Sequence, residues 1–295
     1  MRNLITFFIL NLLCQSLTVN ADELKVTFLG TGTPVPSIER FGSSTLIEHK
    51  GKYFLFDVGR GATIRLSQIG MYPSDIDNVF LTHLHSDHIT GFDDFWITGG
   101  IWQRANTLNV YGPDGTKSFV EHTQAAFSLD AFYREKQSSL NLKGLEVNVT
   151  EIKEGLIYDE DGLKVTAFRV DHGAVEHAYG YRIDSDRRSV LLSGDTTYSE
   201  NLIANSRELD LLIHEVSVIE PKLLQSNPKL KSISKYHTSL QQLHKLVEKV
   251  NPNKTVLNHL LLIGADETEL SHLLETQFQD QSIDVGQDLM TIHLR

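Results

Sequence analysis

The segment LTHLHSDHITG at residues 81–91 constrains this chain more than any other feature, because it places three histidines and one aspartate within six positions. It overlaps the end of DNVFLT, residues 77–82, whose mostly apolar composition predicts a short buried strand. Open α/β sheets carry functional side chains on the loops that leave the carboxyl ends of such strands. The segment therefore predicts a site at the edge of a sheet, built from side chains that bind metals.

The four side chains divide naturally between two cations. His83 and His85 are two residues apart, so in extended backbone they point the same way and can hold one cation. Asp87 and His88 follow on the next turn and can face a second cation beside it. A zinc site takes about four ligands, chiefly imidazole nitrogen and carboxylate oxygen. Two such sites therefore need further ligands from elsewhere in the chain.

Candidate ligands follow three other apolar segments. His172 follows LKVTAFRVD, Asp195 follows RSVLLSG and His259 follows KTVLN. Burying a polar side chain at a strand end is costly unless it has a partner. A carboxylate has two oxygens and can bridge two metals about 3.5–4 Å apart, which makes Asp195 a candidate bridge. Each residue alone is equally well explained as a cap or a hydrogen-bonded core residue; the density of HLHSDH favours the metal.

Short apolar runs alternate with turn residues along the rest of the chain. They predict helices over 62–70, from 115, over 238–250 and over 266–277. They predict strands over 24–30, 43–49, 52–59, 77–82, 107–112, 145–152, 163–170, 180–184, 188–194, 210–216, 254–260 and 288–294. No repeat or linker divides this series, so we expect one mixed α/β domain.

Residues 1–21 have the layout of a secretory signal peptide: Arg2, an apolar run over 4–13, and a small-residue cleavage site before Asp22. We therefore expect a mature domain over 22–295 that is periplasmic or secreted. An amphipathic N-terminal helix is the alternative. The apolar run is too short for a stable membrane anchor. The chain's one cysteine, Cys14, lies in this segment, so the mature domain has no disulfide, thiolate ligand or cysteine nucleophile.

The net charge of −11 at pH 7 describes an acidic protein. An acidic surface repels nucleic acid unless a local basic patch compensates, and the sequence contains no dense run of Lys and Arg. On this ground the charge balance argues against polyanionic partners.

THLHSDH resembles the HxHxDH signature of the metallo-β-lactamase superfamily. The resemblance extends over nearly all of the mature chain, because FLGTGTPVPS, FDVGRGATIRL, VDHGAVEHAYGYRI, LLSGDTTYS, LLIHEV, KYHTSL and VLNHL occur in the order typical of its ribonuclease Z-like and arylsulfatase-like branch. The resemblance implies an α/β (α+β) fold, a four-layer αββα sandwich of the metallo-β-lactamase type. It also implies two Zn²⁺ ions at one edge, with Mn²⁺ or Fe²⁺ as alternatives.

The resemblance also assigns roles to residues. It implies that His83, His85 and His172 hold the first metal. It implies that Asp87, His88 and His259 hold the second, and that Asp195 bridges the two.

On this two-metal arrangement, Asp87 can orient the nucleophile or take its proton. The resemblance implies His237 of KYHTSL as general acid and Glu215 of HEV as the residue that orients it. The structural alternatives are a neighbour of a helix cap for His237 and a strand-end salt bridge for Glu215. His177 rivals His172 as a ligand, and His214 is either a support for the site or a buried structural residue.

These expectations describe an exported dinuclear zinc hydrolase that cleaves a small ester, a phosphodiester or an aryl sulfate, by attack of a metal-bound hydroxide. Asp195 at the bridging position disfavours β-lactam cleavage. The short hairpin between His172 and Asp195 leaves no room for the arm with which ribonuclease Z grips transfer RNA, so we expect a small-molecule substrate and no tRNA. The alternatives are a lactone or thioester hydrolase, or a metal-loaded binding protein without turnover. Members of this branch are often dimers, which suggests a homodimer.

Overall fold

Strands with apolar residues at every second position form the centre of the molecule. In β1 (Leu24–Gly30), Leu24, Val26 and Phe28 are fully buried on one face, because residues two apart in a strand point the same way. The opposite sheet presents the same pattern from β8 (Leu163–Arg169) and its neighbours. The two inner faces therefore share one hydrophobic core.

The structure, a computed structural model, describes residues 23–138, 142–160 and 162–295. Within these ranges the strands form two 7-stranded sheets. In spatial order, the first sheet consists of β14 (Thr291–Leu294), β1, β2 (Ser44–His49), β3 (Lys52–Phe56), β4 (Asn78–Phe80), β5 (Leu108–Gly112) and β6 (Val147–Glu151). The second consists of β13 (Ile283–Val285), β12 (Lys254–Ile263), β11 (Leu211–Ile219), β10 (Ser189–Leu192), β9 (Tyr179–Asp184), β8 and β7 (Gly155–Glu160).

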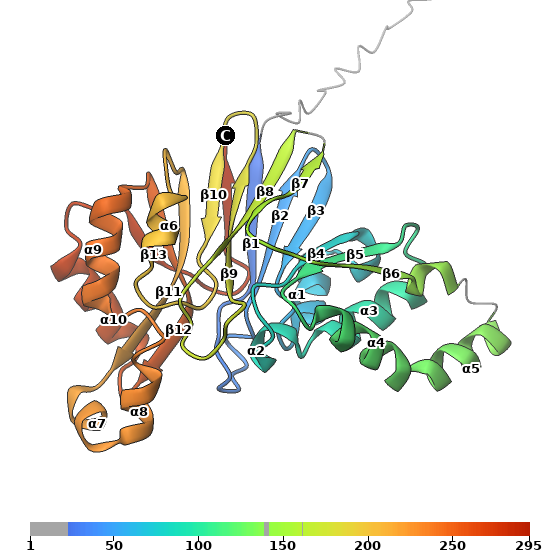
Figure 1. Cartoon of the computed structure of the whole chain (residues 1–295), viewed down its shortest axis with the longest axis horizontal. Coiled ribbons are helices and arrows are strands. Elements are labelled where there is room, and N and C mark those ends of the chain that lie inside the picture. The colour runs from blue at the N-terminus through green and yellow to red at the C-terminus, as the bar shows by residue number, and fades with distance from the viewer. Residues whose placement is uncertain (1–22, 139–141, 161) are drawn as a thin grey trace, which may run out of the picture.

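Helices cover the outer faces of both sheets (Figure 1). Beside the first sheet lie α1 (Ala62–Gln68), α2 (Ser86–Ile89), α3 (Phe92–Ile101), α4 (Thr116–Ala126), α5 (Ser128–Ser138) and the short 3-10 helices Pro73–Asp75 and Leu142–Leu145. Beside the second lie α6 (Glu200–Ala204), α9 (Leu240–Val250) and α10 (Glu267–Gln277), while α7 (Pro221–Ser226) and α8 (Pro228–Ile233) project from it.

Each helical layer packs on its sheet through a separate apolar cluster, so four layers enclose three hydrophobic interfaces. The αββα sandwich expected from the sequence is confirmed. None of the helices in the described part of the chain is both long and apolar enough to cross a bilayer.

The parallel half of each sheet positions the site. Strands β3 to β6 run parallel in the first sheet, and β10 to β13 run parallel in the second. The carboxyl ends of parallel strands reach a common edge, where the following loops gather their side chains. The loops that follow β4 and β10 meet at this edge and carry five of the seven candidate ligands, while His172 follows the antiparallel strand β8 and His259 lies within β12.

The strands with strong apolar patterns were predicted within a few residues, whereas several exposed elements were not predicted. Strand β7 and helices α5, α7 and α8 are largely exposed, so their sequences lack a clear apolar period. One predicted strand, 52–59, ends early. Asp57 has a φ of 58°, which turns the backbone out of the extended conformation after Phe56.

Candidate metal centre

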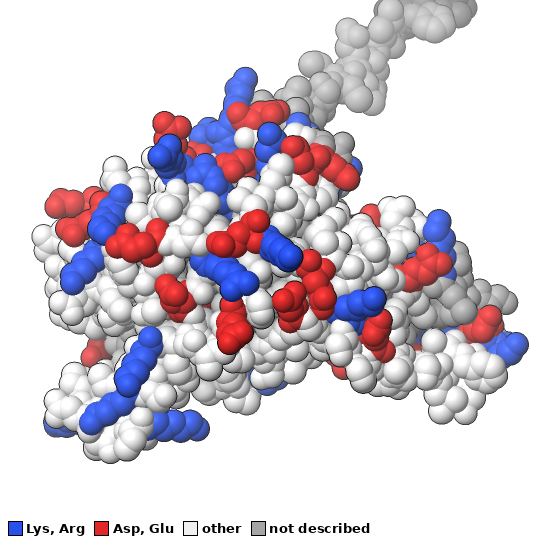
Figure 2. Space-filling model, viewed as in Figure 1, with Lys and Arg blue, Asp and Glu red and all other residues white. Residues whose placement is uncertain are grey.

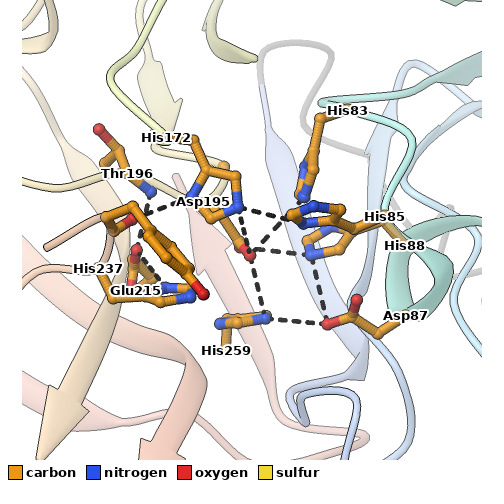
Figure 3. A network of polar contacts seen from close by, with 12 residues as sticks. His83, His85, Asp87, His88, His172, Asp195, Thr196, Glu215, His237 and His259 are labelled. Carbon is orange, nitrogen blue, oxygen red and sulfur yellow. Dashed lines mark hydrogen bonds and ion pairs between the residues drawn. The ribbon is translucent and has the colours of Figure 1, made fainter. Parts of the chain in front are cut away.

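The candidate ligands lie where strands of both sheets end (Figure 3). His83 follows the last residue of β4 by three positions, His172 follows β8 by three, and Asp195 follows β10 by three. The single turn of helix α2 then carries Asp87 and His88, both of them buried. Segments far apart in the sequence thus deliver polar side chains to one place because their strands end together.

His259 reaches the site in a different way, because it lies within β12 rather than after it. The ladder between β11 and β12 shifts register between Glu215 and Val216, whose partners are Asn258 and Leu260, so His259 is the extra residue of a β-bulge. Its φ of 44° lies in the left-handed region, which is uncommon for residues other than glycine. The bulge turns the imidazole towards Asp195 instead of into the sheet.

The seven predicted ligands converge in two groups. In each group the ligand atoms lie within 4.8 Å of one another. The first group consists of His83, His85, His172 and Asp195, and the second of Asp87, His88, Asp195 and His259. Asp195 belongs to both, so the structure divides these residues in the same way as the sequence resemblance implied.

Asp195 lies between the two groups. Its Oδ2 is 3.8 Å from Nε2 of both His83 and His172, and 3.2 Å from Nε2 of His259. Its Oδ1 is 3.3 Å from Nε2 of His88. One buried carboxylate therefore faces nitrogens of both groups, as a bridging ligand requires.

The remaining ring nitrogens hold the imidazoles in place. The Nδ1–H of His172 donates to the carbonyl oxygen of Tyr236 at 2.9 Å. Nδ1 of His83 lies 3.0 Å from the hydroxyl oxygen of Thr82. Such contacts fix the orientation of each ring and leave Nε2 available to a cation.

Asp57 is a supporting residue that the sequence analysis missed. It is buried, it accepts hydrogen bonds from the backbone N–H and the hydroxyl of Thr82, and it lies 2.7 Å from Nδ1 of His88. It therefore orients His88 of the second group directly, and it orients His83 of the first group through Thr82. The signal was an aspartate directly after the apolar strand KYFLF, where an unpaired charge would be expensive.

The pKa values of the site residues follow from burial and from the charges of their buried neighbours. Burial lowers the pKa of His172 to about 4 and the pKa of His83 well below its ordinary value, so both rings are neutral at pH 7. For Asp195, burial alone would raise the pKa, but His259 and His88 outweigh it and hold the pKa well below its ordinary value. Neutral imidazoles and an ionised carboxylate are the forms that bind cations.

The donor set fits divalent cations. Within the described residues, Nε2 of His83, Nε2 of His88 and Oδ1 of Asp195 are buried and make no hydrogen bond. Leaving such atoms unsatisfied in a protein interior costs roughly 1–3 kcal/mol each, more for a charged group. His83 belongs to the first group, His88 to the second and Asp195 to both, so one cation in each group would satisfy all three atoms (Figure 3).

The predicted catalytic pair lies beside the two groups. Nδ1 of buried His237 is 2.9 Å from Oε1 of Glu215, and the same oxygen accepts the backbone N–H of Thr196 at 2.8 Å. The ring of His237 stacks on that of His259 with centroids 5.6 Å apart. Because Nδ1 faces the carboxylate, it carries the proton, and Nε2 remains for a substrate.

His177 and His214, whose roles the sequence left undecided, lie outside both groups. His177 is partly exposed and its Nε2 is 3.5 Å from Asp114, so it is not the rival of His172 that the sequence suggested. His214 is fully buried and Nδ1 donates to the carbonyl oxygen of Glu215, which supports the structural alternative. The predicted signal peptide, 1–21, lies outside the described residues.

Comparisons with known proteins agree with this geometry. The family described as "Anti-Pycsar protein Apyc1" matches residues 24–261. Ribonuclease Z of Mycobacterium bovis (strain BCG / Pasteur 1173P2) is 34% identical over 278 residues, which cover 92% of this chain and 98% of that protein. The chain is a ribonuclease Z-like member of the metallo-β-lactamase superfamily. The superfamily and the ribonuclease Z-like character expected from the sequence are thereby confirmed, and with them a metal-dependent hydrolase, whereas the arylsulfatase-like character stays a prediction.

Several solved structures resemble this chain over more than nine-tenths of its length. The metallo-β-lactamase fold protein YhfI from Bacillus subtilis has a TM-score of 0.70 and 19% identity, and covers 92% of this chain and 100% of its own. The short form of human tRNase Z has a TM-score of 0.69 and 22% identity, with 91% and 98% covered. Zn²⁺-bound PqqB from Methylobacterium extorquens has a TM-score of 0.64 and 16% identity, with 92% and 100% covered. These likenesses show the shared fold.

The expectation of a small-molecule ester substrate and no tRNA is wrong, because the similar proteins include ribonuclease Z and tRNase Z. It depended on the missing arm between His172 and Asp195, but the same 278 aligned residues span 98% of the mycobacterial ribonuclease Z, which leaves no room for a long arm there either. The absence of an arm therefore does not separate this ribonuclease Z-like chain from relatives named for RNA cleavage. The overall charge was an equally weak argument, since it averages over local patches.

Asp57→Ala should weaken metal binding without removing a ligand. The change leaves His88 and Thr82 without their common partner, and losing such a support typically reduces metal affinity by about 10- to 100-fold. Competition with a chromogenic chelator measures the affinity. The matched control is Asp114→Ala, an exposed aspartate beside His177, which should bind metal like the unmodified chain. Equal affinities for both variants would contradict the role given to Asp57.

Proposed function

We propose that this chain is a metal-dependent phosphodiesterase that cleaves RNA, with two divalent cations at its centre. The observation that carries the proposal is the position of Asp195 between two groups of imidazole and carboxylate ligands, with the Glu215–His237 pair alongside. The names of the 34% identical relative and of the human structural neighbour support RNA as the substrate.

The residues of the first group would hold one cation, those of the second group the other, and Asp195 both. Zinc fits the imidazole-rich donor set, with Mn²⁺ or Fe²⁺ as alternatives. When bound, such ions supply Lewis acidity, which lowers the pKa of water and neutralises charge on phosphoryl oxygens. Asp87, whose Oδ2 is 3.1 Å from Nε2 of His259, is placed to orient the attacking water.

Glu215 and His237 serve the leaving group. The carboxylate accepts a hydrogen bond from Nδ1–H of His237 and thereby fixes the ring, so Nε2 faces the site. Cleavage of an RNA phosphodiester expels a ribose oxygen, a poor leaving group that needs a proton. A protonated His237 delivers that proton from Nε2, and Glu215 stabilises its positive charge. The buried position of the pair, next to His259, keeps bulk water from competing for the proton.

The zinc-loaded chain, residues 22–295, should cleave an RNA hairpin with a 3′ extension and hydrolyse bis-p-nitrophenyl phosphate. Elemental analysis should find two ions per chain. Treatment with a chelator should abolish both activities, and zinc should restore them. p-Nitrophenyl sulfate and an acyl lactone serve as comparison substrates. Hydrolysis of the sulfate or the lactone without phosphodiester cleavage would contradict the proposal, and metal binding without any turnover would favour a binding protein.

His237→Ala should slow RNA cleavage far more than hydrolysis of bis-p-nitrophenyl phosphate. General acid catalysis contributes about 10²- to 10⁴-fold where the leaving group needs a proton, and p-nitrophenolate does not. The readout is the ratio of kcat values on the two substrates, with His177→Ala as the control because that ring lies outside the site. Equal slowing on both substrates would remove His237 from the role of general acid.

We further propose that the chain is exported, on the evidence of the signal-peptide layout of residues 1–21. When the full chain is expressed in a Gram-negative bacterium, the periplasmic fraction should contain a protein whose N-terminal residue is Asp22, as intact mass determines. Replacing two residues of the apolar run with Arg should keep the protein uncleaved in the cytoplasm. Full-length protein in the cytoplasm of the unmodified strain would contradict export.

A further inference from the structure

The segment 221–236, which comprises α7, α8 and the turn after them, forms a projection that we call the lysine lobe. It contains four lysines and no aspartate or glutamate, although the whole chain has 38 acidic and only 27 basic residues. The four are Lys222, Lys229, Lys231 and Lys235. All are exposed, and no ion pair joins any of them to a described carboxylate within 4.0 Å. Figure 2 shows the lobe as blue and white, with the acidic residues on the body above it.

Packing does not explain this lobe. None of the residues in α7 or α8 is buried, so the two short helices contribute little to the hydrophobic core. The lobe is nevertheless tied to the body at its base. The backbone N–H of Glu220 donates to the carbonyl oxygen of Ile263, and that of Ser217 donates to the carbonyl oxygen of Thr238. Within the lobe, the side chain of Asn227 caps α8. Because the lobe is held in place but adds little to the core, we look for its role in its exposed surface.

The lobe ends at the catalytic centre. Lys235 is followed by Tyr236, whose carbonyl oxygen accepts the hydrogen bond of His172, and then by His237. A cavity of about 340 Å³ lies at the foot of the lobe, and its lining includes Leu224 and Ser234 of the lobe together with His237, but none of the candidate metal ligands. The lobe and His237 therefore border the same cavity.

We propose that the lysine lobe binds the phosphate backbone of the RNA substrate and directs the strand towards His237. The inference rests on the proposed function and specifies which surface holds the polyanion. At physiological ionic strength the Debye length is about 8 Å, so phosphates at the lobe interact with its lysines more than with the net charge of the molecule. Exposed, unpaired ammonium groups contact phosphates without reading the base sequence.

The test replaces all four lobe lysines with glutamine in the zinc-loaded full domain. On a single-stranded RNA, kcat/KM should fall at least about tenfold relative to kcat/KM on bis-p-nitrophenyl phosphate, because the small ester does not span the lobe. The salt dependence should fall as well: the slope of log kcat/KM against log salt should decrease by about 2 to 3, near 0.7 for each phosphate contact.

The matched control removes four other exposed lysines, and so makes the same change in net charge. These are Lys136, Lys153, Lys164 and Lys245. The control should retain the RNA-to-ester ratio and the salt slope of the unmodified domain. Equal losses in both quadruple variants would overturn the lobe proposal in favour of net charge, and an unchanged ratio in the lobe variant would overturn it outright.

Failure of the proposed function gives a different result. If the unmodified domain hydrolyses the ester but leaves RNA intact, RNA cleavage is wrong, and binding of a fluorescent RNA measured by anisotropy still decides the lobe. Binding that is lost only in the lobe variant supports the lobe. RNA binding that is equal in both variants, combined with lobe-dependent binding to phosphatidylglycerol vesicles, would overturn it in favour of a membrane surface.

Discussion

The structure depends on one electrostatic arrangement: two buried carboxylates, Asp57 and Asp195, among imidazoles that cannot all be protonated together. A buried negative charge is expensive unless positive charge or hydrogen-bond donors surround it. Asp57 has the backbone and hydroxyl of Thr82 as donors, whereas Asp195 faces ring nitrogens from several sides. The field of Asp195 raises the pKa of His88 and His259 against the effect of burial, and the same field attracts a metal cation.

The two sheets allow this polar site to form without disrupting the hydrophobic core. A helix turn, three loops and one bulge each contribute one or two polar groups, and the strands behind them are apolar and fully packed. The catalytic pair uses the same device. Glu215 lies on β11, directly before the register shift that turns His259 towards Asp195. The hydrogen-bonded ladder between β11 and β12 therefore fixes the spacing between the catalytic pair and the metal ligands.

The sequence predicted features that are local or periodic and missed those that depend on folding back. HLHSDH is dense enough to be recognised by itself, and the alternating strands revealed the sandwich. Asp57 was missed because one aspartate after a strand has many explanations until His88 is seen beside it. The lysine lobe was missed because its four lysines are spread over 14 residues and become a patch only when α7 and α8 lie together. The net charge of −11 sums over the whole chain, so it gave no sign of this local basic surface.

The ligands of the candidate centre come from both halves of the sandwich. Residues 83–88 extend from the first sheet, whereas His172, Asp195 and His259 extend from the second. A cation held between them would link the two sheets. Because it binds only the folded chain, its binding would raise the free energy of unfolding. With such a cation bound, metal supply would set the lifetime of the folded protein as well as its activity, because loss of the ion would let this edge open to proteases more often.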